Sequence, residues 1–143
     1  MKTFAKLGIL MLLVAIEVMV ACSKKSNSTP VTLQEVLTGS DQQVHLYQEG
    51  TADKTSDYTG YLFSFNTNGN LLVTRGALTF NGNWLLTTTP DTRLNIQFAG
   101  TGIDSVLLKL QHNWKVVTYS VDLIQMINDD VGANQTLHFA PKQ

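Results

Sequence analysis

Hydrophobic residues at every second position mark two stretches of the chain as half-buried strands. Aromatic residues stand at positions 61, 63 and 65, and apolar residues at 94, 96 and 98 alternate with polar ones. Because side chains of a strand point alternately to opposite faces, each stretch presents one apolar face to a core. Shorter runs of the same kind predict further strands at 43–47, 71–73, 84–86, 114–119, 123–127 and 137–139.

Turn-forming residues separate these runs. We expect Asn68-Gly69 and Asn81-Gly82 to form tight hairpin turns, because this dipeptide readily takes the positive φ angles that such turns need. Pro90-Asp91 and the segment 120–122 separate the later strands. Connections this short make sequence neighbours pair in space. The pattern predicts an all-β fold, an antiparallel up-and-down meander of about eight strands that closes into a barrel or a curled sheet.

Two short segments favour helix. Thr32 and Glu35 have the spacing of a capping box, which predicts a helix at 33–38 that stops at Gly39. Asp104 can cap a second helix at 105–111, where apolar residues recur at helical spacing. A strand is the alternative for this second segment.

The N-terminal pattern is that of a secretory signal peptide. Lys2 and Lys6 precede an apolar run from Leu7 to Val20, and Ala21-Cys22 follows it. The alternative is an uncut transmembrane anchor, but the run is short for a span and Glu17 would lie in hydrocarbon. We therefore expect a signal peptide at 1–21, a lipidated Cys22 with a flexible tether at 22–31, and one β domain at 32–143.

The charge of the chain excludes one class of function, and its cysteine content excludes disulfides as a source of stability. Removal of residues 1–21 leaves 8 basic and 10 acidic residues, and the basic ones are scattered. Nucleic-acid binding is excluded because it needs clustered Lys and Arg. Cys22 is the single cysteine, so packing rather than disulfides must stabilise the domain. About 120 residues suffice for one domain with one core.

No catalytic or metal-binding pattern emerges from the residue types that carry such chemistry. His45, His112 and His138 have no second ligand at metal spacing, although a site shared by all three stays open. Asp129-Asp130 can be a carboxylate pair for acid–base chemistry or calcium, or simply a solvated turn. No Gly-x-Ser-x-Gly motif is present. We expect no enzyme, no cofactor and no metal.

The aromatic residues allow two interpretations. Trp84 and Trp114 each follow an Asn and each begin an expected strand. They can line the barrel mouth and stack on a ligand, or fill the core as large apolar side chains. Tyr61, Phe63 and Phe98 are open to the same two interpretations.

The order of these features is similar to that of a known class of proteins. A Cys22 lipobox, a short helix, the 61–65 run before Asn68-Gly69-Asn70, a Leu94-Asn95-Ile96 strand and a closing Leu137-His138-Phe139 together resemble small lipocalin-like lipoproteins of Gram-negative outer membranes. The resemblance implies cleavage before an acylated Cys22, which carries diacylglycerol and palmitate and anchors the protein in the outer membrane. The first strand departs from it, since Gln43–Tyr47 stands where a Gly-x-Trp is frequent.

Three functions are compatible with this sequence. We expect a non-enzymatic binding or interaction module of the cell envelope, anchored through Cys22, facing the periplasm and contacting an envelope protein. The first alternative is a carrier that holds a small apolar or amphipathic ligand inside the barrel. A hydrolase or isomerase is the second alternative. The number of inward aromatic residues favours a filled barrel, because an eight-stranded barrel either fills with side chains or holds one small ligand.

Overall fold

The computed structural model describes residues 30–143, which form nine strands and three short helical segments. The helical segments are α1 (Leu33–Thr38), the 3-10 turn η1 (Thr55–Tyr58) and α2 (Ser105–Leu108). The strands are β1 (Gln42–Glu49), β2 (Ala52–Asp53), β3 (Tyr61–Phe65), β4 (Asn70–Arg75), β5 (Leu78–Thr87), β6 (Arg93–Phe98), β7 (Asn113–Tyr119), β8 (Ile124–Asn128) and β9 (Gln135–Pro141).

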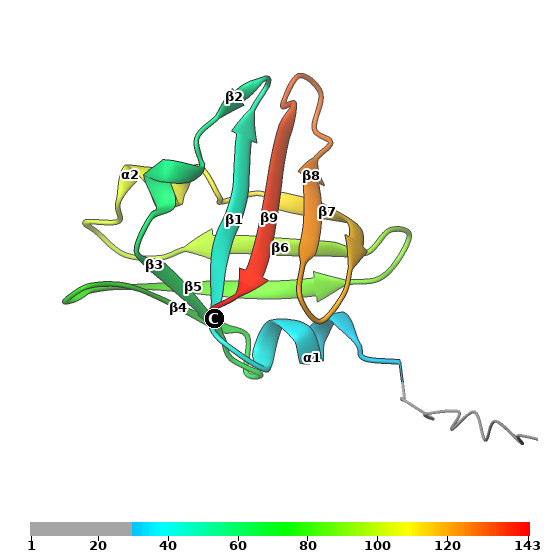
Figure 1. The fold of residues 1–143 in the computed structure, drawn as a ribbon, viewed down its shortest axis with the longest axis horizontal. Helices are drawn as coiled ribbons and strands as arrows, with labels where there is room; N and C mark the ends of the chain where they lie inside the picture. The colour runs from blue at the N-terminus through cyan, green and yellow to red at the C-terminus, as the bar shows by residue number, and fades with distance from the viewer. Residues whose placement is uncertain (1–29) are drawn as a thin grey trace, which may run out of the picture.

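Eight of these strands close into an antiparallel up-and-down barrel, as the sequence predicts. Neighbours follow chain order from β3 to β9, and β1 lies between β9 and β3. The first strand pairs with the last through seven residue pairs, whereas β1 and β3 share one pair, Gln42 with Phe63. Strand β2 is a two-residue extension beside the end of β1. Figure 1 shows β1, β9 and β8 crossing in front of β4, β5 and β6.

The alternating pattern decides which side chains fill the barrel. Tyr61, Phe63 and Phe65 are all at least 97% buried, as are Leu94 and Ile96. One prediction needs correction: Phe98, at the end of β6, is half-buried and packs against the edge of the core. The end of a strand leaves an inward side chain partly open to solvent, so alternation alone overstates its burial.

Helix α1 forms where the capping box predicts it. The Thr32 hydroxyl oxygen accepts a hydrogen bond from the Glu35 backbone N–H, and the Glu35 carboxylate accepts one from the Thr32 N–H at 2.7 Å. The helix buries Leu33, Val36 and Leu37, which covers one end of the barrel (Figure 1). The buried Gln42 side chain donates to the Val36 carbonyl oxygen at 3.0 Å and ties the helix to β1.

Helix α2 is shorter than predicted. Asp104 caps it as expected, with one carboxylate oxygen accepting from the Val106 N–H at 3.1 Å. The helix ends at Leu108 instead of Gln111 because the next turn tightens: the Leu110 N–H bonds to the Leu107 carbonyl at 2.9 Å. Such three-residue spacing is typical of a 3-10 turn at a helix end.

Only one of the two Asn-Gly pairs forms the predicted turn. Gly69 lies in the turn between β3 and β4 with a φ of 86°, as predicted. The prediction for Asn81-Gly82 is wrong, because both residues lie inside β5 and the turn is instead at Gly76-Ala77. Phe80, Gly82 and Trp84 continue one inward face of β5.

A close approach of neighbouring backbones explains why Gly82 stands within β5. A Cβ at this position would lie 2.5 Å from the Gln97 carbonyl oxygen on β6. A glycine inside a strand often marks such an approach of another backbone. Trp84 therefore lies in the middle of a ten-residue strand and does not begin one.

Candidate functional site

The two tryptophans lie inside the barrel and pack in its core. The sequence allowed either this arrangement or contact with a ligand. Trp114 is fully buried and Trp84 is 93% buried. Their indole N–H groups donate to the carbonyl oxygens of Leu110 and Asn66, each at 2.9 Å. Buried indoles need such a partner, and here the partner is the chain itself. Both tryptophans are therefore core residues of the barrel.

Aromatic rings touch throughout this interior. The ring centres of Phe63 and Phe139 are 5.1 Å apart, and those of Phe65 and Trp84 are 5.6 Å apart with the planes nearly perpendicular. Tyr47 meets Tyr58 edge to face at 5.0 Å. These distances lie within the range of direct aromatic packing. Side chains of the protein therefore fill the part of the barrel interior that these rings occupy.

A polar hollow is bordered by the connection between β8 and β9. Figure 1 shows this connection at the end of the barrel opposite α1. The hollow has a volume of about 520 Å³. The connection between β8 and β9, residues 129–134, forms one wall, and we name it the rim loop. The lining residues outside the rim loop are Glu49, Gly50, His112, Asn128 and Gln135.

The Tyr47 hydroxyl connects two residues that line this hollow, Glu49 and Gln135. It donates to the Glu49 carboxylate at 3.1 Å and accepts from the Gln135 side-chain amide at 3.1 Å. The Asn128 side-chain amide donates in turn to the side-chain oxygen of Gln135 at 2.8 Å, and Lys109 pairs with Glu49 at 3.1 Å. Four elements, β1, β8, β9 and the turn after α2, thus meet in one hydrogen-bonded chain.

Electrostatics keep this network in one protonation state near neutral pH. Burial and the nearby Glu49 carboxylate raise the pKa of Tyr47 far above its usual value, so its hydroxyl remains a donor. The hydrogen bond from Lys109 lowers the pKa of Glu49, which favours the carboxylate. A neutral donor therefore faces a charged acceptor. This charge-assisted hydrogen bond stabilises the network.

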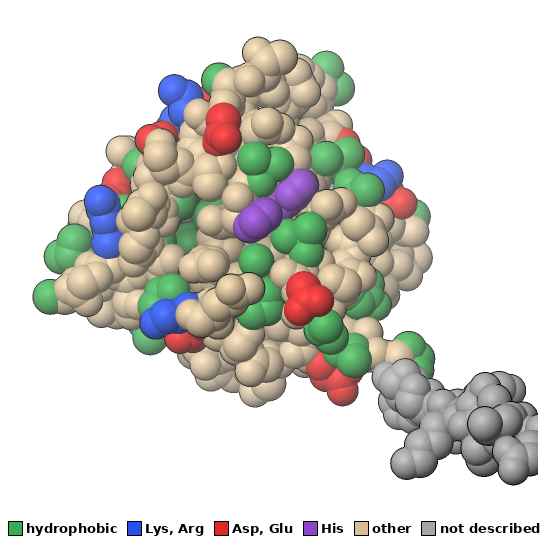
Figure 2. All heavy atoms as spheres, in the orientation of Figure 1, with side chains coloured by type: hydrophobic (Ala, Val, Ile, Leu, Met, Phe, Trp, Pro, Cys, Tyr) green, Lys and Arg blue, Asp and Glu red, His purple; other side chains and the backbone are tan. Residues whose placement is uncertain are grey.

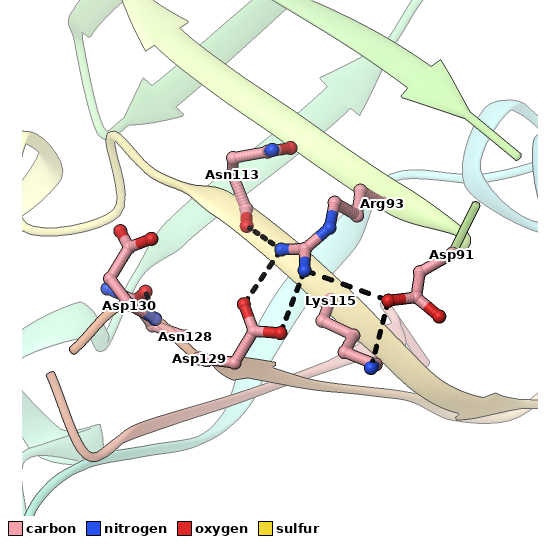
Figure 3. Close-up of polar contacts among 7 residues, drawn as sticks. All are labelled: Asp91, Arg93, Asn113, Lys115, Asn128, Asp129 and Asp130. Atoms are coloured by element: carbon pink, nitrogen blue, oxygen red, sulfur yellow. Dashed lines mark hydrogen bonds and ion pairs between the residues drawn. The ribbon is translucent and has the colours of Figure 1, made fainter. Parts of the chain in front are cut away.

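A second network of charged side chains holds the rim loop from outside (Figure 3). The two terminal guanidinium nitrogens of Arg93 donate to the Asp129 carboxylate at 2.8 Å, and one of them also donates to the Asn113 backbone carbonyl oxygen at 3.3 Å. Asp91 lies 3.8 Å from Arg93 and 3.0 Å from Lys115. The two-pronged contact lowers the pKa of Asp129 and raises that of Arg93.

Asp129 and Asp130 have separate structural roles. The sequence allowed two interpretations of them, a carboxylate pair or a solvated turn. Asp129 is the acceptor for Arg93, whereas the backbone N–H of Asp130 donates to the Asn128 side chain at 3.1 Å. The Asp130 carbonyl oxygen accepts from the Ala133 N–H at 2.9 Å, which closes the turn. These contacts favour the solvated turn.

The three histidines do not converge. His112 stands edge-on to the Trp114 ring at 5.7 Å, near the hollow, while His45 and His138 lie on β1 and β9. Within residues 30–143, no cluster of three or more histidine, cysteine or acidic side chains is suited to hold a metal ion.

Sequence reasoning named Asp129 but missed the contacts between distant residues that hold the rim loop and the network beside it. Arg93 and Asp129 are 36 positions apart, and Tyr47 and Gln135 are 88 apart. No local motif joins such pairs, because strand register alone brings them together. The sequence does indicate a loop between β8 and β9, because polar residues and a glycine stand there. It does not indicate which residues contact that loop.

The expected lipidation site Cys22, the expected signal peptide at 1–21 and most of the expected tether lie outside the described residues. No helix among residues 30–143 combines the length and the apolar character needed to cross a bilayer.

Comparison with known proteins gives one structural likeness. No family model matches the sequence, and no curated protein gives a significant match. A solved structure, a DUF4847 family protein from Bacteroides vulgatus ATCC 8482, is similar with a TM-score of 0.58. The likeness covers 76% of this chain and 96% of that chain at 14% identity. The described chain is thus an eight-stranded antiparallel β-barrel that resembles a DUF4847 bacterial protein in fold.

Proposed function

We propose that this protein is a lipid-anchored, non-enzymatic interaction module of the cell envelope, held in the outer membrane through Cys22 and facing the periplasm. The observation that carries the proposal is the filled interior, in which Trp114, Phe63 and Phe139 are fully buried. A barrel filled in this way favours recognition by its outer surface over a ligand held inside.

The rim loop is the surface that we assign to a partner protein. Its Val131 side chain is fully exposed, and a large apolar side chain displayed on a loop is suited to enter a pocket of another protein. Arg93 at one side and Asn128 at the base fix the loop. A loop that is ordered beforehand loses less conformational entropy on binding.

The position of the rim loop fits an anchored protein. Residue 30, where the described chain begins, adjoins α1 at one end of the barrel, and the rim loop is at the other end (Figure 1). The flexible tether that the sequence predicts leads from α1 to a lipid on Cys22 and therefore leaves the rim loop free to reach a partner away from the bilayer.

The anchor is tested with a Cys22→Ser variant. Stable membrane attachment takes more than one acyl chain, so the variant is expected to remain unprocessed or to be released as soluble protein. Membrane fractionation and the mass of the mature protein measure this. A variant that still fractionates with the outer membrane at the wild-type mass contradicts the anchor. Protease treatment of intact cells then distinguishes the periplasmic face from the cell surface.

The partner surface is tested by placing a photo-crosslinking residue at Val131 in intact cells. We expect one discrete protein adduct, which is absent when the crosslinker stands instead at Leu78, an exposed residue of the β4–β5 hairpin. Equal adducts at both positions, or none at Val131, contradict the rim-loop assignment. Native mass spectrometry of the protein from its own envelope checks the alternative: a bound small molecule retained in stoichiometric amount favours the carrier function.

A further inference from the structure

Two histidines lie next to each other on the outer face of the barrel, away from the rim loop. Figure 2 shows two histidine side chains touching on the face that β1 and β9 form in Figure 1. Strand pairing identifies them: His138 on β9 is the partner of Leu46, the residue that follows His45 on β1. Outward side chains of paired strands lie close enough to share one small ligand.

An irregularity in β1 produces this pair. The register between β1 and β9 shifts between Val44 and Leu46, so that His45 is the additional residue of a bulge. Val44 packs against the core and Tyr47 is fully buried, three positions apart instead of two. A bulge re-aims a side chain in this manner, and here it leaves His45 exposed beside His138.

Both imidazoles are available as ligands. In the part of the chain that the structure describes, neither side chain has a hydrogen bond or an ion pair to another residue. Partial burial and the neighbouring His45 lower the pKa of His138, and the second effect requires the two rings to lie close together. Neutral imidazole is the form that binds metal ions.

The surroundings of the pair do not repel a cation. A hollow beside His45 is lined by Gln43, Asp122, Leu123, Ala140, Pro141 and Gln143. None of these residues is basic, and Asp122 adds a negative charge to the same hollow. The Asp122 carboxylate therefore supplies one charge near His45 that attracts a cation.

We propose that His45 and His138 form a surface site for a divalent transition-metal ion of the class that prefers imidazole, with Cu²⁺ as its strongest member. Two imidazole nitrogens on neighbouring strands occupy adjacent positions of the ion, and water fills the others. Affinity for nitrogen sites rises along the first-row metals to Cu²⁺, whereas Ca²⁺ and Mg²⁺ prefer oxygen ligands. The site is independent of the rim loop and of the proposed partner.

Proton NMR of the protein purified from its own envelope in detergent tests the site. The chain has three histidines, so three imidazole Cε1–H signals report on it, and single His→Gln variants assign them. Paramagnetic Cu²⁺ added below one equivalent is expected to broaden the His45 and His138 signals and to leave His112 sharp. The same amount of Ca²⁺ is expected to leave all three unchanged.

Calorimetric titration with Cu²⁺ gives the second measurement. His45→Gln is expected to weaken binding at least about tenfold, since one of two protein ligands is lost. His45 is exposed, so this variant should fold as wild type, which circular dichroism checks. The matched control, His112→Gln, is expected to bind as wild type. Equal broadening of all three histidines, or an unchanged affinity in His45→Gln, overturns the proposal.

Discussion

Inside the barrel, the Phe63 and Phe139 rings pack against each other out of water, whereas at the rim Arg93 and Asp129 meet through two short hydrogen bonds that solvent can reach. The interior contact removes apolar area from water, which contributes free energy in proportion to the area buried. The rim contact is between exposed ions, and water and salt screen it. We infer that the interior determines whether the chain folds and that the rim determines the shape of one loop.

The largest effect is expected from Phe63→Ala. The ring is fully buried, and its loss leaves a cavity that the surrounding strands cannot close, so the free energy of unfolding should fall by about 3–5 kcal/mol. Urea unfolding measures it. Gln97→Ala, on the exposed face of β6, is the matched control and should change stability by less than about 0.5 kcal/mol. Equal losses in the two variants would contradict the assignment of the interior as the source of stability.

Tyr47→Phe tests the boundary between the two regions, since the ring belongs to the core and the hydroxyl to the rim. The variant keeps the packing and removes the group between Glu49 and Gln135, which should cost about 0.5–1.5 kcal/mol.

The sign of the pH dependence follows from the raised pKa of Tyr47. The neutral phenol stabilises the fold fully below the unfolded pKa of about 10, and this contribution is lost as the pH rises above that value. Wild type should therefore lose more stability than Tyr47→Phe between about pH 7 and about pH 11, as measured by urea unfolding. A larger loss in the variant would show that the hydroxyl does not have this role.

The smallest global effect is expected from Arg93→Gln. The side chain is at the surface, so overall stability should barely change, but backbone amides of residues 129–133 should exchange faster with deuterium. Asp129 has a lowered pKa, so its contribution is present above the ordinary carboxyl pKa and lost as the pH falls through the lowered one. The difference between wild type and variant should vanish in acid. Lys142→Gln serves as the control, because Lys142 follows the end of β9 that is farthest from the rim loop. Equal loop exchange in both variants would refute the role of Arg93.

Local interactions explain what could be predicted from the sequence. The inward faces of β3 and β6, the Thr32–Glu35 capping box and the turn at Gly69 each depend on residues a few positions apart. Eight strands with short connections then permit few topologies other than an up-and-down barrel. The prediction of a turn at Asn81-Gly82 was wrong because a glycine is also suited to a strand whose neighbour lies very close. Here the backbone of β6 lies close to Gly82.

The sequence alone determined the fold class, because alternation and turn chemistry are local properties of the chain. Tertiary structure decided the rest. The pairing of β1 with β9 placed His45 outward through a bulge, and strand register brought Arg93 to Asp129 across 36 residues. Partners so far apart leave no mark in any short stretch of sequence, since the contact exists only once the barrel has closed.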